Sequence, residues 1–379
     1  MTPDLVVVGG GIIGLSAAWR CAKRGLDVVV CDPEPGRHAT HASAGMLAPV
    51  TEAHYGEEAL LRLNLASATR WPSFAAELED ASGLPVGYRP CGSVAVAFDA
   101  DDNRALDDLE AYHRRLGLRS ERLGSTATRD LEPMLSPRVR GGLAVEDDHN
   151  VDNRLVADAL IGLAERGSFE LRRVAVQRVL DEGGRVVGVE AEGGERLHAG
   201  QVLLAAGCWS NGIDGVPEAA RPPVRPVKGQ ILRVQGPADP PVLSRNVRGL
   251  VRGMHLYLVP RASGRIVIGA TVEEQGYDTT VTAGAVHDLL RDATELVPAL
   301  AELELVEALA GLRPGTPDNA PLVGPTPVDG LLVATGHYRN GVLLAPITAD
   351  AVADAVGGGE PVEEAAAMDP GRFVREAVR

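Results

Sequence analysis

The stretch VVVGGGIIGL at residues 6–15 constrains the fold of this chain more than any other part of it. The apolar, valine-rich run from Leu5 to Val8 predicts a strand, and three consecutive glycines follow it at once. Apolar residues then recur at helical spacing until Gly25, which predicts a helix that ends there. The next segment, LDVVVCD, predicts a second buried strand that ends in Asp32. The order is therefore strand, glycine turn, helix and strand.

The glycines match the pattern G-x-G-x-x-G, which binds the pyrophosphate of a dinucleotide when it lies between a strand and a helix. Gly9 permits the tight turn, Gly11 lets backbone amides approach the pyrophosphate, and Gly14 allows the helix to pack close to the strand. Asp32, eighteen residues beyond Gly14, would accept hydrogen bonds from ribose hydroxyls. A glycine-rich turn also occurs without a nucleotide, but here the strand, the helix and the acidic residue are all in place. The pattern predicts a dinucleotide site and leaves open whether it binds NAD or FAD.

Two later segments repeat the change from a buried strand to glycine. The first is QVLLAAGCWS, whose strand leads into Ala206 and Gly207, and the second is GLLVATGHYRNG, whose strand leads into Gly336. A Rossmann-like domain is therefore assembled from distant pieces of the chain. After the second segment, the spacing predicts a helix from about Asn340 to Val356. Its amino terminus would suit the negative charge that develops on a flavin during reduction, although a plain strand-to-helix connection would have the same pattern.

The segment PEPGRHATHASAGMLAP at residues 33–49 is rich in small residues. We expect an open loop here rather than an element of the core. A loop of this kind would lie along an extended cofactor.

The middle of the chain favours a second sheet. Residues 86–100 alternate like a strand, residues 101–117 have the pattern of an amphipathic helix, and LVPRASGRIVIG at residues 258–269 predicts a hairpin with a Ser-Gly turn. We therefore expect a mostly antiparallel sheet from about residues 86–150 and 217–312.

Composition excludes several classes of partner. Acidic residues outnumber basic ones by 52 to 37, giving a net charge of −15, so we expect neither nucleic acid nor an anionic membrane as a partner.

The four cysteines are scattered, which argues against a disulfide framework and favours a cytoplasmic location. The apolar amino-terminal run lacks the features of a signal peptide, and we expect no membrane span. The nine histidines show no metal-ligand spacing, so no metal site is predicted.

The chain resembles the FAD-dependent amine oxidoreductases of the D-amino acid oxidase superfamily, and within it the glycine oxidases of thiamine biosynthesis. Four stretches over nearly the whole chain carry the resemblance: VVVGGGIIG with Asp32, ASAGML, GLRPGTPD with PLVG after it, and GHYRNGVLLAP. In that family the acidic residue is usually glutamate, and here it is Asp32. Because the last two stretches contain no cysteine to carry a covalent flavin, we expect FAD to be bound non-covalently.

The resemblance implies an α/β fold with two discontinuous domains. The expected FAD-binding domain, with its Rossmann-like parallel sheet and helices, comprises residues 1–85, 151–216 and 313–379, and the interleaved α+β substrate-binding domain comprises residues 86–150 and 217–312. Further FAD-lining residues implied by the resemblance are Ile12, Ile13, Thr40, Ala44, Gly45, Met46, Val174, His337, Tyr338, Arg339, Asn340, Gly341, Val342 and Leu343.

Two arginines and a tyrosine are the candidates for binding substrate. A guanidinium binds a carboxylate through two parallel hydrogen bonds, although most arginines in a chain are ordinary surface residues. By resemblance, Arg313 clamps the substrate carboxylate, Tyr257 contacts the same carboxylate, and Arg339 lies near substrate and flavin. No side chain is assigned as a catalytic base, because positioning of the substrate against the flavin does most of the work.

The resemblance implies oxidation of glycine, and of sarcosine or small D-amino acids, by molecular oxygen. The products would be an imine or oxo acid, ammonia and hydrogen peroxide, with the imine of glycine feeding thiazole synthesis, and the protein would be a homotetramer. Sarcosine oxidases carry a lysine near the segment GATV, where this chain has Val272 in place of the usual methionine of glycine oxidases, a change that would reshape the pocket.

Three other functions remain open at this point. One is a D-amino acid dehydrogenase that passes electrons to a quinone or a protein. Another is a scaffold with a structural FAD, and the last is a dehydrogenase that uses only nicotinamide.

Overall fold

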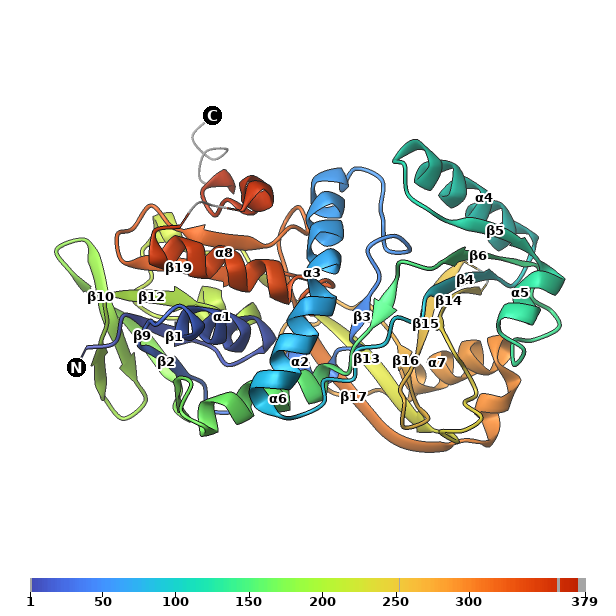
Figure 1. Ribbon diagram of the computed structural model, residues 1–379, viewed down its shortest axis with the longest axis horizontal. Helices are drawn as coiled ribbons and strands as arrows, with labels where there is room; N and C mark the ends of the chain where they lie inside the picture. Colours follow the sequence, from blue (N-terminus) through green and yellow to red (C-terminus); the bar gives the residue numbers. More distant parts are fainter. Residues whose placement is uncertain (1, 252, 360–361, 374–379) are drawn as a thin grey trace.

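The structure, a computed structural model, describes residues 2–251, 253–359 and 362–373 and has a sheet toward each end of its long axis (Figure 1). The first sheet has six strands, in the order β18 (Leu322–Pro325), β19 (Leu331–Thr335), β12 (Gln201–Leu204), β1 (Leu5–Val8), β2 (Val28–Cys31) and β8 (Glu170–Arg172). All neighbouring strands are parallel except β18 and β19. The predicted parallel sheet is thus built from distant parts of the sequence.

The side chains of β1 alternate between two apolar layers, which explains why the strand is apolar throughout. Leu5 and Val7 belong to a core shared with four helices: α1 (Ile12–Lys23), α3 (Glu58–Ser82), α6 (Asn153–Glu165) and α8 (Ala345–Gly357). Val6 and Val8 face the other way, toward a three-stranded antiparallel sheet of β9 (Val176–Glu182), β10 (Arg185–Ala191) and β11 (Arg196–His198). Both faces of β1 are therefore covered.

The second large sheet has eight strands. Their order is β17 (Glu304–Gly315), β13 (Arg225–Gln235), β16 (Arg265–Gly269), β15 (Met254–Pro260), β14 (Asn246–Val251), β4 (Ser93–Ala97), β6 (Gly141–Val145) and β5 (Glu121–Gly124). Neighbouring strands are antiparallel except β14 and β4. One face packs on α7 (Ala283–Leu296), and the other contacts Ala44 and Met46. This sheet and its hairpin of β15 and β16 confirm the mostly antiparallel sheet that the sequence predicts.

The remaining elements connect or cover the sheets. They are α2 (His38–Ala42), β3 (Met46–Leu47), β7 (His149–Asn150), α4 (Ala100–Arg115), α5 (Ser125–Leu131) and the 3₁₀ helices η1 (Gly207–Gly212), η2 (Glu218–Ala220), η3 (Pro298–Glu302) and η4 (Glu363–Met368). In Figure 1, α2 and α3 lie between the six-stranded and the eight-stranded sheet. Among the described residues, no helix combines the length and the apolar composition needed to cross a bilayer.

The expectation of an open loop at residues 33–49 is wrong for part of this segment, although much of the segment does line the cavity. Residues His38–Ala42 form helix α2, and both Ala42 and Ala44 are buried. The sequence could not show this helix because five residues are too few for a helical repeat of apolar positions to emerge.

The predicted start of the last helix is also wrong, since α8 begins at Ala345 and not near Asn340. Pro346 has no amide hydrogen to donate to the carbonyl of Val342, four residues earlier. The carbonyl of Leu343 instead accepts hydrogen bonds from side chains of α3. The amino-terminal amides of α8 therefore lie further along the chain than the sequence predicts.

Candidate active site

A cavity of about 550 Å³ lies where the two large sheets meet. One side of it is formed at the carboxyl ends of β1, β2, β12 and β19, and the other by residues of β13, β15 and β17. Ligands of open α/β sheets bind outside the carboxyl ends of the strands. The cavity therefore lies where the parallel sheet favours a cofactor, and it faces the second sheet.

The glycine turn after β1 is packed too tightly for side chains. Gly9 has a φ of +111°, and a Cβ there would stand 2.5 Å from the carbonyl oxygen of Ala205. A Cβ on Gly14 would stand 2.0 Å from the carbonyl oxygen of Gly9. The amide of Ile12, in the first turn of α1, donates to Thr40 Oγ1 at 2.9 Å. The turn thus brings the amino terminus of α1 to the cavity wall, as the sequence predicts.

Asp32 is held at the end of β2 by two backbone amides. Its Oδ2 atom accepts from the amide of Gly10 at 2.6 Å, and its Oδ1 atom accepts from the amide of Glu34 at 2.7 Å. These bonds tie the carboxylate to the glycine turn, and the residue lines the cavity.

The segment around α2 is fixed by two buried arginines of the eight-stranded sheet and its hairpin. Arg233 Nη2 donates to the carbonyls of His41 and Ser43 at 3.0 and 3.2 Å, and Arg261 Nη2 donates to the carbonyl of Ala44 at 2.7 Å. Burial lowers the pKa of each guanidinium to about 10, so both still carry their charge at neutral pH. The backbone of residues 41–44 is therefore held by two arginines of the eight-stranded sheet and its hairpin.

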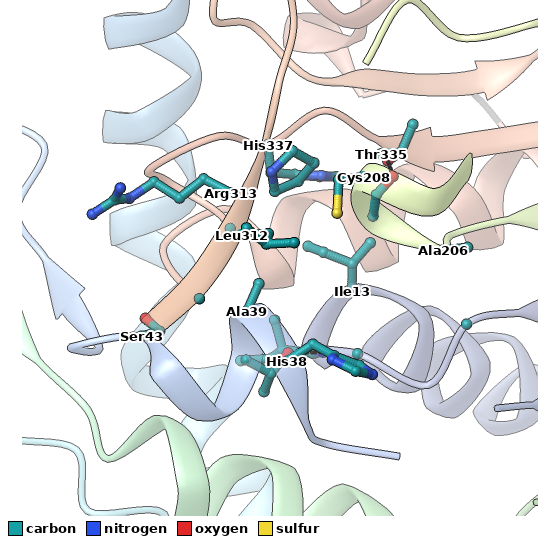
Figure 2. A pocket seen from close by; sticks show the side chains of 18 of the residues that line it. Ile13, His38, Ala39, Ser43, Ala206, Cys208, Leu312, Arg313, Thr335 and His337 are labelled. Carbon is teal, nitrogen blue, oxygen red and sulfur yellow. Dashed lines mark hydrogen bonds between the residues drawn. The ribbon is translucent and has the colours of Figure 1, made fainter. Parts of the chain in front are cut away.

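Arg313 and Tyr257 each lie over a glycine of a neighbouring strand. A Cβ on Gly229 of β13 would stand 2.3 Å from Arg313 Nη1, and a Cβ on Gly269 of β16 would stand 2.4 Å from Tyr257 Oη. Both side chains line the cavity. Figure 2 shows Arg313 extending from β17 away from Ala206. Because Gly229 and Gly269 have no side chains, the guanidinium and the phenol can occupy this space.

Burial sets the protonation states of Tyr257 and His337. Burial raises the pKa of the Tyr257 phenol, while Arg313 lowers it by a smaller amount, so the hydroxyl keeps its proton at neutral pH. His337 is buried and its Nε2 atom lies 2.9 Å from Thr348 Oγ1. Burial lowers the pKa of His337 to about 3, which keeps the imidazole neutral.

The sequence does not reveal Glu52, which also lines the cavity. Its Oε1 atom lies 2.6 Å from Arg248 Nη1, and Arg248 stands directly opposite Tyr257 across the β14 and β15 pair. Burial would raise the pKa of Glu52, but Arg248 and Arg339 outweigh it and hold the pKa below its usual value. The residue is therefore a carboxylate. The only signal that could have found it is strand register, which a single sequence does not show.

Arg339 lies near the carboxylates of Glu52 and Glu57. Its Nη2 atom is 3.8 Å from Glu57 Oε2, and its guanidinium lies 5.1 Å from the ring centre of Tyr338. The side chain is 30% exposed, which fits a group at the mouth of the cavity better than one that clamps a ligand.

Most of the site residues expected from the sequence come together in this cavity. Those that line it are Gly9, Gly11, Ile12, Ile13, Asp32, Thr40, Ala44, Gly45, Met46, Ala206, Gly207, Tyr257, Arg313, His337, Tyr338, Arg339, Gly341 and Val342. Those that do not line it are Gly14, Val174, Gly336, Asn340 and Leu343. Val272 does not line it either and is 64% exposed, so the expectation that it reshapes the pocket is wrong.

Comparison with known families identifies the kind of protein. A family model described as DAO, FAD dependent oxidoreductase, matches residues 4–355. The chain belongs to this DAO family. The family resemblance, the fold class and the assignment as an FAD-dependent oxidoreductase are thereby confirmed.

Individual relatives of this DAO-family chain have more specific names. It is 37% identical over 355 residues to a bifunctional protein ThiO/ThiG of Trichormus variabilis, covering 93% of this chain but 52% of that one. The chain thus spans about half the length of that relative. It is 36% identical to a glycine oxidase of Pseudomonas aeruginosa, with 98% and 99% of the two chains covered. The crystal structure of glycine oxidase from Geobacillus kaustophilus superposes with a TM-score of 0.89 at 31% identity, covering 98% of this chain and 99% of that one.

The cavity fits the cofactor of the family, and the prediction of FAD is confirmed. Its volume of about 550 Å³ is in the usual range of small-molecule and cofactor sites. Gly9 and Gly11 line the cavity at the amino terminus of α1, where a pyrophosphate binds, and Asp32 stands at the end of the next strand.

Proposed function

We propose that this DAO-family chain is a glycine oxidase. The observation that carries the proposal is the placement of Arg313 and Tyr257 on bare glycine backbone within the cavity that fits FAD. The names of similar proteins, glycine oxidase and ThiO/ThiG, support the same reaction and its link to the thiazole branch of thiamine biosynthesis.

Arg313 and Tyr257 hold the substrate by its carboxylate. The guanidinium forms charge-assisted hydrogen bonds to the two oxygens, and the protonated phenol donates a third. A carboxylate fixed at one end leaves the α-carbon in a restricted position next to the cofactor. Substrate placement is the main contribution of these two side chains.

Bound FAD supplies the acceptor for the two electrons of the α-C–H bond. Glycine thereby becomes its imine, and water hydrolyses the imine to glyoxylate and ammonia. Oxygen takes up the two electrons with two protons and leaves as hydrogen peroxide. Glu52 is paired with Arg248 and has a lowered pKa, which makes it a poor proton acceptor, so positioning without a side-chain base remains the proposed mechanism.

The same proposal extends to features that follow from the family likeness. We place the FAD-binding domain at residues 1–85, 151–216 and 313–379, and the substrate-binding domain at residues 86–150 and 217–312. A cytoplasmic homotetramer that oxidises sarcosine and small D-amino acids as well as glycine completes the proposal.

The test is an anaerobic titration of the purified holoenzyme. Glycine, sarcosine, D-alanine and D-proline are added separately while flavin absorbance is recorded, and air is then admitted. Bleaching by glycine, with recovery in air and production of peroxide, supports an oxidase. Bleaching without recovery in air would favour a dehydrogenase with another acceptor, and no bleaching by any of the four would contradict the substrate class.

A further inference from the structure

A segment that borders the cavity through Tyr277 runs along β13 and contacts Arg313. It comprises residues 271–278, between the end of β16 and the start of α7, and is called here the 271–278 segment. The amide of Lys228 donates to the carbonyl of Glu273 at 2.8 Å, and the amide of Glu273 donates to the carbonyl of Lys228 at 3.0 Å. Gln230 Nε2 also donates to Glu273 Oε1 at 2.8 Å. The segment therefore continues the pairing of β16 with β13 beyond the end of β16.

This pairing provides two acceptors for Arg313. Arg313 Nη1 donates to the carbonyl of Thr271 at 3.2 Å and to the carbonyl of Lys228 at 3.3 Å. One acceptor belongs to β13 and the other to the 271–278 segment. The direction of the guanidinium therefore depends on how closely the segment stays against the strand.

The side chain of Lys228 anchors the far end of the segment. The residue is 1% exposed, and its Nζ atom lies 2.6 Å from Asp278 Oδ2 and 4.0 Å from Glu273 Oε2. Burying an ammonium group without a partner costs free energy. The Lys228 charge therefore strongly favours the conformation in which the Asp278 carboxylate lies against it. Lys228 does not line the cavity, because successive side chains of a strand point to opposite faces and Gly229 faces the cavity.

We propose that Lys228 is a positioning residue for substrate binding. Its ion pair with Asp278 holds the 271–278 segment against β13, and the segment in turn holds Arg313 Nη1 through the carbonyl of Thr271. The inference rests on the proposed function, in which Arg313 binds the substrate carboxylate. Lys228 acts through Arg313 and touches neither substrate nor cofactor.

The test breaks the ion pair at its exposed end. The Asp278 side chain is 48% exposed, so Asp278→Asn removes the negative charge with little change of shape, and Glu273 Oε2 remains 4.0 Å from Lys228 Nζ as a second carboxylate. The matched control is Asp329→Asn, because Asp329 forms a 2.7 Å ion pair with Arg185 on the surface next to the six-stranded sheet. The probe is glycolate, a small carboxylate without an amine, titrated into the holoenzyme while flavin absorbance is followed.

We expect Asp278→Asn to weaken glycolate binding about tenfold or more, the usual effect of losing one hydrogen bond to a charged group. FAD content and kcat at saturating glycine should stay within about twofold of the unmodified protein, since the change affects carboxylate binding in the ground state and the transition state alike. Asp329→Asn should bind glycolate like the unmodified protein. Equal glycolate affinity in Asp278→Asn and Asp329→Asn would overturn the inference.

A double-mutant cycle distinguishes action through Arg313 from a general structural effect. If Lys228 and Asp278 act through Arg313, Asp278→Asn should weaken glycolate binding less than about twofold when Arg313 is already alanine. An equal loss in both backgrounds would overturn the inference while leaving the proposed function intact. If Arg313→Ala alone binds glycolate like the unmodified protein, the proposed role of Arg313 itself fails.

Discussion

The guanidinium of Arg313 lies directly over Gly229, so closely that a Cβ at Gly229 would stand 2.3 Å from Nη1. Gly229 of β13 pairs with Gly311 of β17. Gly311 is two residues before Arg313 on the same strand. The side chain thus crosses from its own strand onto bare backbone of the next. The position of Arg313 in the cavity therefore requires that residue 229 have no side chain.

Replacement of Gly229 by alanine should displace Arg313 without unfolding the protein. The blocked atoms are the far end of a flexible side chain, which moves at lower cost than backbone. We expect KM for glycine to rise about tenfold or more, because misplacing a group that positions substrate is expensive, while FAD content stays constant. Steady-state kinetics checks this, with Gly284→Ala as control, since a Cβ there meets nothing within 4 Å. An unchanged KM would contradict the role of the Gly229 gap.

Replacement of Glu52 by glutamine should change which substrates are accepted. The change keeps the shape of the side chain and leaves the charge of Arg248 without its 2.6 Å carboxylate partner at the cavity. A secondary amine with a second carboxylate, such as iminodiacetate, should then gain about tenfold in kcat/KM relative to glycine, since one repulsive charge is removed. The ratio of the two kcat/KM values is the measurement.

The matched control for that change is Glu146→Gln, which breaks an exposed 2.7 Å pair with Arg245. The control should leave the ratio unaltered. Equal changes for glycine and iminodiacetate in Glu52→Gln would show that the charge of Glu52 does not select between substrates.

Replacement of Gly9 by alanine should prevent FAD binding, whereas the same change at Gly25 should not. Both glycines have positive φ, +111° and +87°, so an alanine is strained at either position. Only at Gly9 does the Cβ also meet backbone, 2.5 Å from the oxygen of Ala205, whereas at Gly25 it meets nothing within 4 Å. Gly25→Ala should lose about 1 kcal/mol of stability and retain its flavin. The ratio of flavin to protein absorbance distinguishes the two, and equal flavin content would contradict a steric role for Gly9.

The neutral imidazole of His337 should make the protein less stable in acid. Burial holds its pKa at about 3, below the usual 6.5, so the unfolded chain binds the proton more readily. The stabilising contribution is complete above pH 6.5, and it falls by up to about 1.4 kcal/mol per pH unit as the pH drops from 6.5 toward 3. Urea unfolding at several pH values should show a flatter acid dependence for His337→Asn than for the unmodified protein. The control is His287→Asn at an exposed histidine, and equal slopes in both variants would contradict the prediction.

The cofactor half of the site was accessible to sequence analysis because its determinants are local. The strand, the glycine turn and the acidic residue at Asp32 lie within one short stretch, and each has a physical reason that holds in any chain. The valine-rich run also predicted the strand β1, whose residues Val6 and Val7 alternate between two cores. Family likeness added the fold of the remaining chain.

The proposed substrate half of the site depends on distant pairings that no local pattern contains. Glu52 and Arg248 are 196 residues apart and meet only because β14 places Arg248 opposite Tyr257. The Gly229 gap under Arg313 likewise follows from the register of β13 and β17. Helix α2 escaped prediction because it is short.

Arg233 and Arg261 donate hydrogen bonds to carbonyls of residues 41–44, most of which line the cofactor cavity. The yellow colour of bound flavin therefore depends on these contacts as well as on the glycine turn. Flavin retention in a purified sample reports on the cofactor pocket and also on whether the eight-stranded sheet has docked. A preparation that emerges pale therefore indicates faulty docking as readily as a damaged nucleotide site, even when its glycine turn is intact.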